Sequence, residues 1–185
     1  MEKWSELISA LKSKGVDFEI GMDNKEIEKI EKIYKIRFPL DLKKFYGYGL
    51  PVSYSFVNWR DLSKENIEKN KLRIQAPIKG IKESLNDVDW DEVYWGKEPK
   101  DEKERNKKIL DHLNQAPRLI PIYSHRYISE LELTPNPVIS IVGSDIIYYG
   151  ETLFSYLQYE FKLKEKNIEY YKKKKNFIPF WSEIM

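Results

Sequence analysis

The sequence predicts a single α+β domain, in which a mostly antiparallel strand meander is covered by N-terminal helices and a C-terminal helix, with a helical insertion. Apolar residues recur at helical spacing through the first 46 residues. From 117 to 150, β-branched and aromatic runs alternate with proline, asparagine and glycine. Residues 60–115 are much more highly charged. We therefore place the α+β domain at 1–161, with the insertion at about 60–115, and a lysine-rich helical tail at 162–185.

The first segment is predicted to be an amphipathic helix near residues 2–13. Its apolar residues follow the i, i+3, i+4, i+7 pattern, and they are Trp4, Leu7, Ile8 and Leu11. Gly15 is expected to end this helix. Residues 16–20 alternate apolar and charged side chains, which predicts a short strand or an extended link.

Residues 23–51 are predicted to form a helix pair around which the rest of the chain packs. Asp23 is a suitable N-cap, and Glu26 stands at the capping-box spacing. The apolar face of the first helix consists of Ile27, Ile30, Ile33 and Tyr34. Because Pro39 disfavours helical geometry at Phe38, the first helix is expected to end there and the second to begin at Pro39. The second helix carries an apolar stripe and ends at two glycines: Leu42, Phe45 and Tyr46, then Gly47 and Gly49.

The segments that follow differ in composition from one another. Residues 52–59 (VSYSFVNW) predict a strand because they are rich in β-branched and aromatic side chains. The insertion is predicted to contain short charged helices at 62–74 and 77–85, a polar aromatic loop at 86–99, and a helix at 100–113. Its apolar residues are few, so we expect it to lie across one side of the sheet without an independent core.

The last third of the chain carries most of the strands. They are predicted at 118–124, 126–133, 136–144 and 145–150. The last two are expected to pair as a hairpin at the turn that follows Gly143. A helix at 151–161 comes next, with Phe154, Leu157 and Phe161 on one face.

Composition limits the possible functions. The 185 residues suffice for one filled core. The absence of cysteine excludes disulfides, thiol catalysis and cysteine metal sites, and it suits a reducing compartment. With 32 basic and 30 acidic residues, the chain exerts no strong overall field on nucleic acid. The N-terminus lacks a secretory pattern, and no apolar run approaches the ~20 residues of a membrane helix. We therefore expect a cytoplasmic protein without a membrane partner.

Three stretches carry a family resemblance. The first is EIEKIEKIYKIRFPLDLKKFYGYGLP at 26–51, with a helix, an LP-x-DLKxFY-like motif and a glycine turn. The second is SFVNW at 55–59. The third combines RLIPIYSHRYIS at 118–129 with NPVISIVGSDIIYYGETLFSYLQYEF at 136–161. In order and spacing they resemble the SUKH superfamily, whose bacterial members include many immunity proteins of polymorphic toxin systems. Phe38 stands where leucine is usual, a conservative apolar change.

This resemblance covers roughly residues 20–60 and 117–161, and it leaves the insertion and the tail unmatched. It implies an α+β fold that acts by binding, without known catalysis. The implied partner is a cognate toxin domain, for example a nuclease, whose active surface the protein would cover. Members of the superfamily counter different toxins, and some relatives are regulators or scaffolds, so a regulatory or scaffold role stays open.

The loop within the insertion is the predicted partner-binding site. It gathers carboxylates around aromatic rings, and the residues are Asp87, Asp89, Trp90, Asp91, Glu92, Tyr94 and Trp95. Aromatic side chains anchor protein contacts, while carboxylates steer a basic partner such as the substrate groove of a nuclease. The alternative is that the aromatic rings attach the insertion to the core and the acids are only solvated.

A catalytic interpretation is weaker. Residues 124–127 (SHRY) supply a hydroxyl and an imidazole, and Asp145 lies on a nearby predicted strand. A serine hydrolase also needs a strained nucleophile turn and an oxyanion hole, and the chain has no G-x-S-x-G. We expect His125 and Arg126 to satisfy carbonyls or a carboxylate instead. Two histidines, the other being His112, cannot complete a structural zinc site without cysteine. The sequence thus predicts no enzyme, no metal and no cofactor.

The tail offers an alternative binding site. Seven lysines lie between positions 162 and 175, followed by the aromatic residues Phe177, Phe180 and Trp181. Such a segment could hold single-stranded nucleic acid or an anionic membrane surface. The competing expectation is a solvated helix face whose terminal aromatic rings dock on the domain. Because arginine is scarce, nucleic acid is the less favoured partner.

Overall fold

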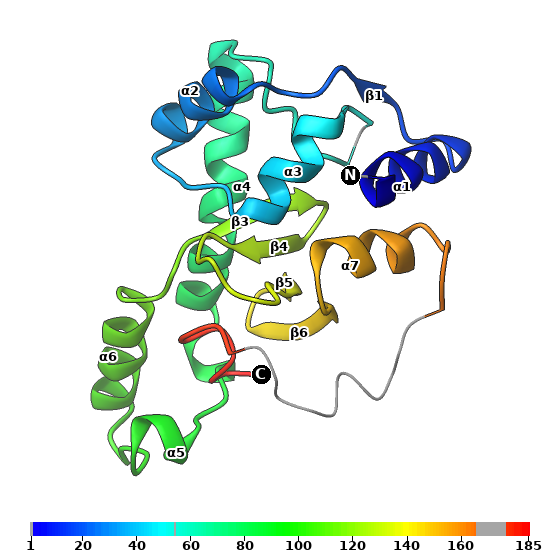
Figure 1. Ribbon diagram of the computed structural model, residues 1–185. Coiled ribbons are helices and arrows are strands. Elements are labelled where there is room, and N and C mark those ends of the chain that lie inside the picture. Colours follow the sequence, from blue (N-terminus) through cyan, green and yellow to red (C-terminus); the bar gives the residue numbers. More distant parts are fainter. Residues whose placement is uncertain (1, 54, 166–176) are drawn as a thin grey trace.

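The computed structural model describes residues 2–53, 55–165 and 177–185, and it shows an α+β fold (Figure 1). The helices are α1 (Glu2–Ser13), α2 (Asn24–Tyr34), α3 (Leu40–Tyr48), α4 (Lys64–Glu83), α5 (Glu92–Trp95), α6 (Glu102–Leu113) and α7 (Leu153–Glu160). A short 3-10 helix, η1, spans Leu85–Asp87. The strands are β1 (Phe18–Glu19), β2 (Leu50–Pro51), β3 (Leu119–Tyr123), β4 (Arg126–Ser129), β5 (Val138–Val142) and β6 (Asp145–Gly150). The predicted fold class is confirmed.

The larger sheet is an antiparallel meander in the order β3-β4-β5-β6. The predicted hairpin is present: β5 and β6 pair with Val142 opposite Asp145, and Gly143 has a φ of 63°, which favours glycine. A separate antiparallel pair joins β1 to β2, with Phe18 opposite Pro51. Alternate residues of the meander point to opposite faces, and both faces are covered.

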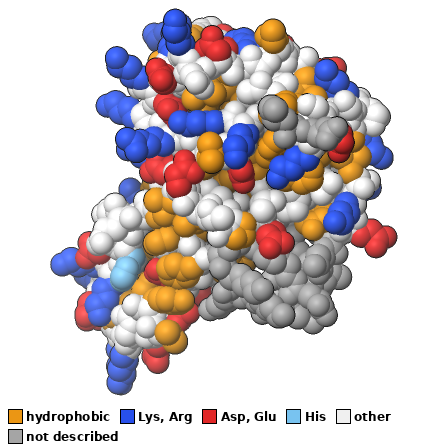
Figure 2. Space-filling view, in the orientation of Figure 1, with side chains coloured by type: hydrophobic (Ala, Val, Ile, Leu, Met, Phe, Trp, Pro, Cys, Tyr) orange, Lys and Arg blue, Asp and Glu red, His pale blue; other side chains and the backbone are white. Residues whose placement is uncertain are grey.

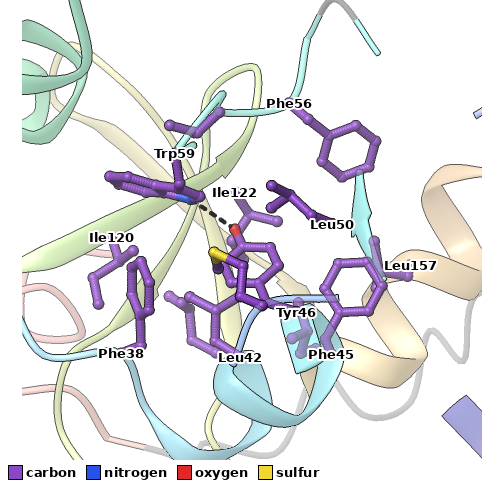
Figure 3. Close-up of a cluster of buried hydrophobic side chains, with 14 of the residues drawn as sticks. Phe38, Leu42, Phe45, Tyr46, Leu50, Phe56, Trp59, Ile120, Ile122 and Leu157 are labelled. Carbon is purple, nitrogen blue, oxygen red and sulfur yellow. Dashed lines mark hydrogen bonds between the residues drawn. The ribbon is translucent and has the colours of Figure 1, made fainter. Parts of the chain in front are cut away.

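The first core lies between one face of the meander and helices α1, α2, α3 and α7. Trp59 lies within it, fully buried, and its indole N–H donates a hydrogen bond of 3.0 Å to the hydroxyl of Tyr46 (Figure 3). The indole packs edge-on against the rings of Tyr34 and Phe38. The sheet contributes Ile120, Ile122, Ile128 and Val138. The apolar faces predicted for 2–13 and 23–46 supply most of the remaining side chains.

The second core covers the opposite face of the meander. The sheet side chains in it are Leu119, Tyr127, Ile139, Ile141 and Ile146. The insertion contributes Ile81, Val88, Trp95, Ile109 and Leu113. The C-terminal segment contributes Ile178, Phe180, Trp181 and Ile184, so the terminal aromatic rings dock on the domain. The insertion therefore buries its few apolar residues against the sheet and the end of the chain.

The two short helices predicted at 62–74 and 77–85 are one helix of 20 residues, α4. Pro77 lies inside it, where it cannot donate to the carbonyl of Arg73 four residues earlier. The hydroxyl of Tyr127 on β4 donates to that carbonyl at 3.4 Å. A partner from the sheet thus satisfies the group that the proline leaves free, and the helix continues across the break expected at Pro77.

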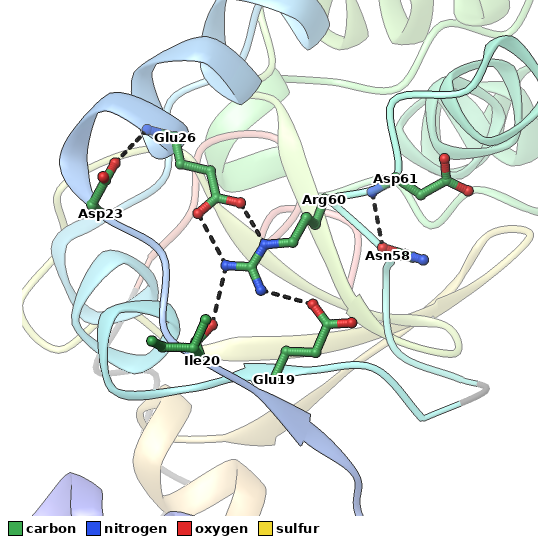
Figure 4. A network of polar contacts seen from close by, with 7 residues as sticks. All are labelled: Glu19, Ile20, Asp23, Glu26, Asn58, Arg60 and Asp61. Carbon is green, nitrogen blue, oxygen red and sulfur yellow. Dashed lines mark hydrogen bonds and ion pairs between the residues drawn. The ribbon is translucent and has the colours of Figure 1, made fainter.

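The prediction of a strand at 52–59 is wrong for the described residues of that range. Strand β2 ends before it, at Pro51, and within it Phe56 makes one isolated bridge to Tyr123. Arg60 fixes the segment that follows: its guanidinium donates to both carboxylate oxygens of Glu26, at 2.6 and 3.0 Å, to Glu19 at 2.7 Å, and to the carbonyl of Ile20 at 3.1 Å (Figure 4). The hydrogen bond with Glu26 raises the pKa of Arg60. Side-chain contacts, rather than a ladder, hold this segment.

Several boundaries differ from the predictions. Helix α2 ends at Tyr34, because Lys35 is left-handed with a φ of 54°, and Pro39 is the N-cap of α3, not its first residue. Asp23 caps α2 as predicted, but the carboxylate of Glu26 binds Arg60. Strand β4 ends four residues before the predicted end at 133. The described end of the tail, 177–185, forms turns, and the part of the predicted helix at 166–176 lies outside the described residues.

Candidate functional site

The predicted binding loop forms the lower end of the molecule in Figure 1, away from the N-terminal helices. We call residues 86–96 the α5 tip. Asp91 caps helix α5 by accepting from the backbone N–H of Val93 at 2.8 Å. Figure 2 shows charged side chains of both signs on this lower end, with hydrophobic side chains among them. The tip is therefore a turn of helix that projects from the second core.

Trp95 holds the tip in place. Its ring is 8% exposed and stacks on His112, with centroids 4.9 Å apart and planes within 12°. Its indole N–H donates to a carboxylate oxygen of Glu183 at 2.5 Å, and its ring also stacks on Phe180 at 6.0 Å. This is the attachment role that the alternative interpretation of the loop expected for an aromatic residue. Trp95 is an internal anchor rather than a surface for a partner.

Trp90 is half-buried and completes the anchor. Its indole N–H donates to the carbonyl of Gly96 at 2.8 Å, and its ring packs edge-on against Trp95 at 5.1 Å. The guanidinium of Arg105 lies 5.9 Å from the ring centroid, within the range of a cation–π contact. Arg105 also donates to two backbone carbonyls, that of Leu85 just before the tip and that of Val88 within it. The tip is thus preorganised.

The carboxylates divide into two kinds. Asp91 is half-buried and serves as the helix cap. Asp87, Asp89 and Glu92 are exposed, and none of them forms an ion pair with a described residue. The tip contains no lysine or arginine. The tip itself therefore carries only negative side chains, and the nearest cation that the structure places against it is Arg105, over the ring of Trp90.

An apolar surface lies beside these acids. The exposed fraction is 87% for Val93, 45% for Tyr94 and 40% for Phe177. The rings of Tyr94 and Phe177 are 5.0 Å apart, and a cavity of about 160 Å³ opens between them, Tyr148 and Met185. Val93 and Phe177 were not in the predicted site. Val93 had a local signal, as an apolar residue on a short polar helix, but Phe177 joins the tip only through the fold.

The residues of the rejected catalytic site do not form a triad among the described residues. The hydroxyl of Ser124, whose φ is 48°, lies 3.0 Å from Nδ1 of His125, and both side chains are exposed. Partial burial, with Arg126 beside it, lowers the pKa of His125. The carboxylate of Glu160 acts on His125 through its charge, but it accepts a hydrogen bond from Nε of Arg126 at 3.2 Å. Asp145 is at the same end of the sheet as His125 but two strands away, because the carbonyl of His125 accepts from the N–H of Ile141 on β5, and Asp145 on β6 is opposite Val142.

Arg126 itself is a structural residue, as the sequence predicted for this position. It is 8% exposed, its guanidinium lies 3.6 Å from the ring centroid of Tyr149, and it donates to the hydroxyl of Ser140 at 2.8 Å. The ion pair with Glu160 joins the sheet to α7. The buried charge is therefore fully engaged within the fold.

The described part of the chain contains no cluster of three or more His, Asp or Glu side chains arranged to hold a metal ion. His112 is stacked on Trp95. Within the same residues, no helix combines the length and the apolar character needed to cross a membrane.

In the predicted nucleic-acid site of the tail, Phe180 and Trp181 are buried and cannot stack on bases. The lysines between 166 and 175 lie outside the described residues.

The chain matches no family model, and comparisons with curated proteins and with solved structures each find no match.

Proposed function

We propose that the protein is a non-catalytic immunity protein that binds a toxin domain and neutralises it by covering its active surface. The observation that carries this proposal is the α5 tip: exposed Val93 and Tyr94, joined by Phe177, stand beside three carboxylates without ion-pair partners among the described residues. A small apolar centre with a charged rim is the usual anatomy of a protein interface. The resemblance of the flanking stretches to the SUKH superfamily supports the same class of function.

The mechanism is occupancy. Asp87, Asp89 and Glu92 attract a basic surface, such as the substrate groove of a nuclease, and raise the rate of encounter. Tyr94 and Val93 then lose their exposed apolar surface against the partner and slow dissociation. Because Trp90 and Trp95 already fix the tip, little conformational entropy is lost on binding. A cysteine-free chain is suited to carrying out this binding in the cytoplasm.

The test is growth rescue. The protein is co-expressed with the product of the reading frame directly upstream of its gene, which this proposal expects to be a toxin, and the rate of complex formation is measured with both purified proteins. Changing Asp87→Asn, Asp89→Asn and Glu92→Gln together should lower the association rate about tenfold at low salt, because three charges leave the encounter surface. Tyr94→Ala should accelerate dissociation and raise the Kd roughly tenfold or more.

A matched control removes three exposed acids from the opposite end of the molecule, with Glu6→Gln, Asp17→Asn and Glu28→Gln. It alters net charge equally and should leave association and rescue unchanged. If both triple variants behave alike, the α5 tip is not the binding surface. Failure of the native protein to bind or rescue against that toxin would end the immunity proposal.

A further inference from the structure

We propose that the protein has a binding site for a small amphipathic carboxylate, a molecule with an apolar tail and one anionic end, in the cavity between its two cores. The cavity has a volume of about 430 Å³. That volume lies within the roughly 300–1,000 Å³ of ordinary small-molecule sites. The site lies apart from the α5 tip and does not depend on the function proposed for it.

The floor of the cavity is apolar and comes from both cores. Helix α2 and the first part of α4 contribute side chains that pack on the first core, whereas the second part of α4, β3 and the C-terminal segment contribute side chains of the second core. These residues are Ile33, Ile74, Pro77, Ile78, Leu119 and Trp181. The cavity between the two cores can therefore accept an apolar tail.

Two aromatic residues of the lining use polar atoms within the fold. The indole N–H of Trp181 donates to the carbonyl of Pro117 at 2.9 Å, and the hydroxyl of Tyr34 accepts from the side-chain amide of Asn70 at 3.2 Å. The exposed amide of Gln75 also lines the cavity, so a ligand tail meets mostly apolar surface with few polar groups. This favours an apolar tail over a sugar or a nucleobase.

The rim of the cavity is cationic. Lys35, Lys71 and Arg118 line it, and no carboxylate does. Lys71 pairs with Glu68 at 2.8 Å on its own helix. Lys35 and Arg118 form no ion pair with a described residue. An anion at the rim would neutralise two like charges that have no partner within the described fold.

Arg118 is held at this rim by the backbone. Its guanidinium donates to the carbonyl of Lys35, the left-handed residue that ends α2. This contact joins two elements that lie 83 residues apart in the sequence, and it brings the two cations to the same side of the cavity. The geometry favours a single anionic group above an apolar floor, which is the chemistry of a carboxylate on a hydrocarbon tail.

The experiment measures binding of octanoate and of 1-octanol to the full chain by titration calorimetry. Octanoate should bind, and octanol should bind at least about tenfold more weakly, because it fills the floor but leaves the cations unpaired. Replacing both lysines, Lys35→Gln with Lys71→Gln, should raise the Kd for octanoate about five- to tenfold and leave octanol unchanged. The control Lys79→Gln with Lys82→Gln removes the same charge from α4, the helix of Lys71, outside the cavity and should change neither.

A second measurement keeps the test independent of the lysine variants. Octanoate should shift the indole N–H resonance of Trp181, identified by its loss in Trp181→Phe, and should leave that of Trp59 in place. No octanoate binding at millimolar concentration would overturn the proposal. So would equal affinity for octanol, unchanged affinity in the Lys35 and Lys71 variant, or an equal loss in the control.

Discussion

The two faces of the meander are covered in different ways. The first core is made by helices whose apolar faces lie in continuous stretches near the N-terminus, and its hydrogen bond between Trp59 and Tyr46 spans only 13 positions. The second core is assembled from the insertion and the end of the chain. Its bonds from Trp95 to Glu183 and from Trp181 to Pro117 span 88 and 64 positions. Distant segments also meet in the first core, where Trp4 of α1 packs edge-on against Phe154 of α7. In the second core, however, even the hydrogen bonds of the buried tryptophans join segments far apart in the chain.

The two cores also support different parts of the molecule. The first core joins one face of the sheet to helices α1, α2, α3 and α7. The second core supports the α5 tip from beneath through Trp95, Phe180 and Glu183. The α5 tip, which we propose as the binding surface, therefore rests on the second core.

The largest expected effect comes from Trp59→Ala in the first core. The change removes a fully buried indole and leaves the hydroxyl of Tyr46 without its donor. We expect the free energy of unfolding to fall by about 3–5 kcal/mol. Denaturant titration followed by circular dichroism should show a lower midpoint for the whole transition. A loss under about 1 kcal/mol would mean that the first core does not carry the stability of the sheet.

Trp181→Ala in the second core should have a smaller and more local effect. Trp181 is as buried as Trp59, but it lies in a terminal segment that can undock without opening the sheet. We expect a loss of about 2–3 kcal/mol, with faster hydrogen exchange in α5, α6 and 177–185 and little change in α1 to α3.

Trp181→Phe is the matched control, because it keeps a ring in place but loses the hydrogen bond to Pro117, at a cost of about 1 kcal/mol. Faster exchange in both cores to the same extent would contradict the proposed difference between them.

The smallest effect concerns pH. Because the pKa of His125 is lowered in the folded protein, the unfolded chain binds more protons near pH 6. Stability should therefore be complete above the ordinary histidine value of about 6.5 and decrease as pH falls through that value toward the lower folded pKa. Comparing denaturant midpoints at pH 7.5 and 5.5, His125→Gln should lose less stability on acidification than the native chain. An equal loss of stability in both proteins would show that His125 does not cause the pH dependence.

The fold divides the residues of the predicted binding loop into exposed side chains and side chains that anchor the loop. The sequence indicated the acids and aromatic residues of the loop, and Asp87, Asp89, Glu92 and Tyr94 are exposed as a binding surface requires. Nothing local distinguished Tyr94 from Trp95, although one ring is exposed and the other stacks on His112. Their difference comes from the C-terminal segment, which offers Phe180 and Glu183 to Trp95.

What the sequence by itself determined was the local order: the amphipathic helices, the cap at Asp23, the glycine turn at Gly143 and the antiparallel meander. Those features follow from side-chain periodicity and backbone preference within a few residues. Only the tertiary structure decided that α4 continues through Pro77 and that residues 52–59 are not a strand. In both places the outcome depends on a partner outside the segment: the hydroxyl of Tyr127 for α4, and for residues 55–58 the side chains of Asn70 and Arg73, which donate to their carbonyls. Local propensity carries no information about such partners.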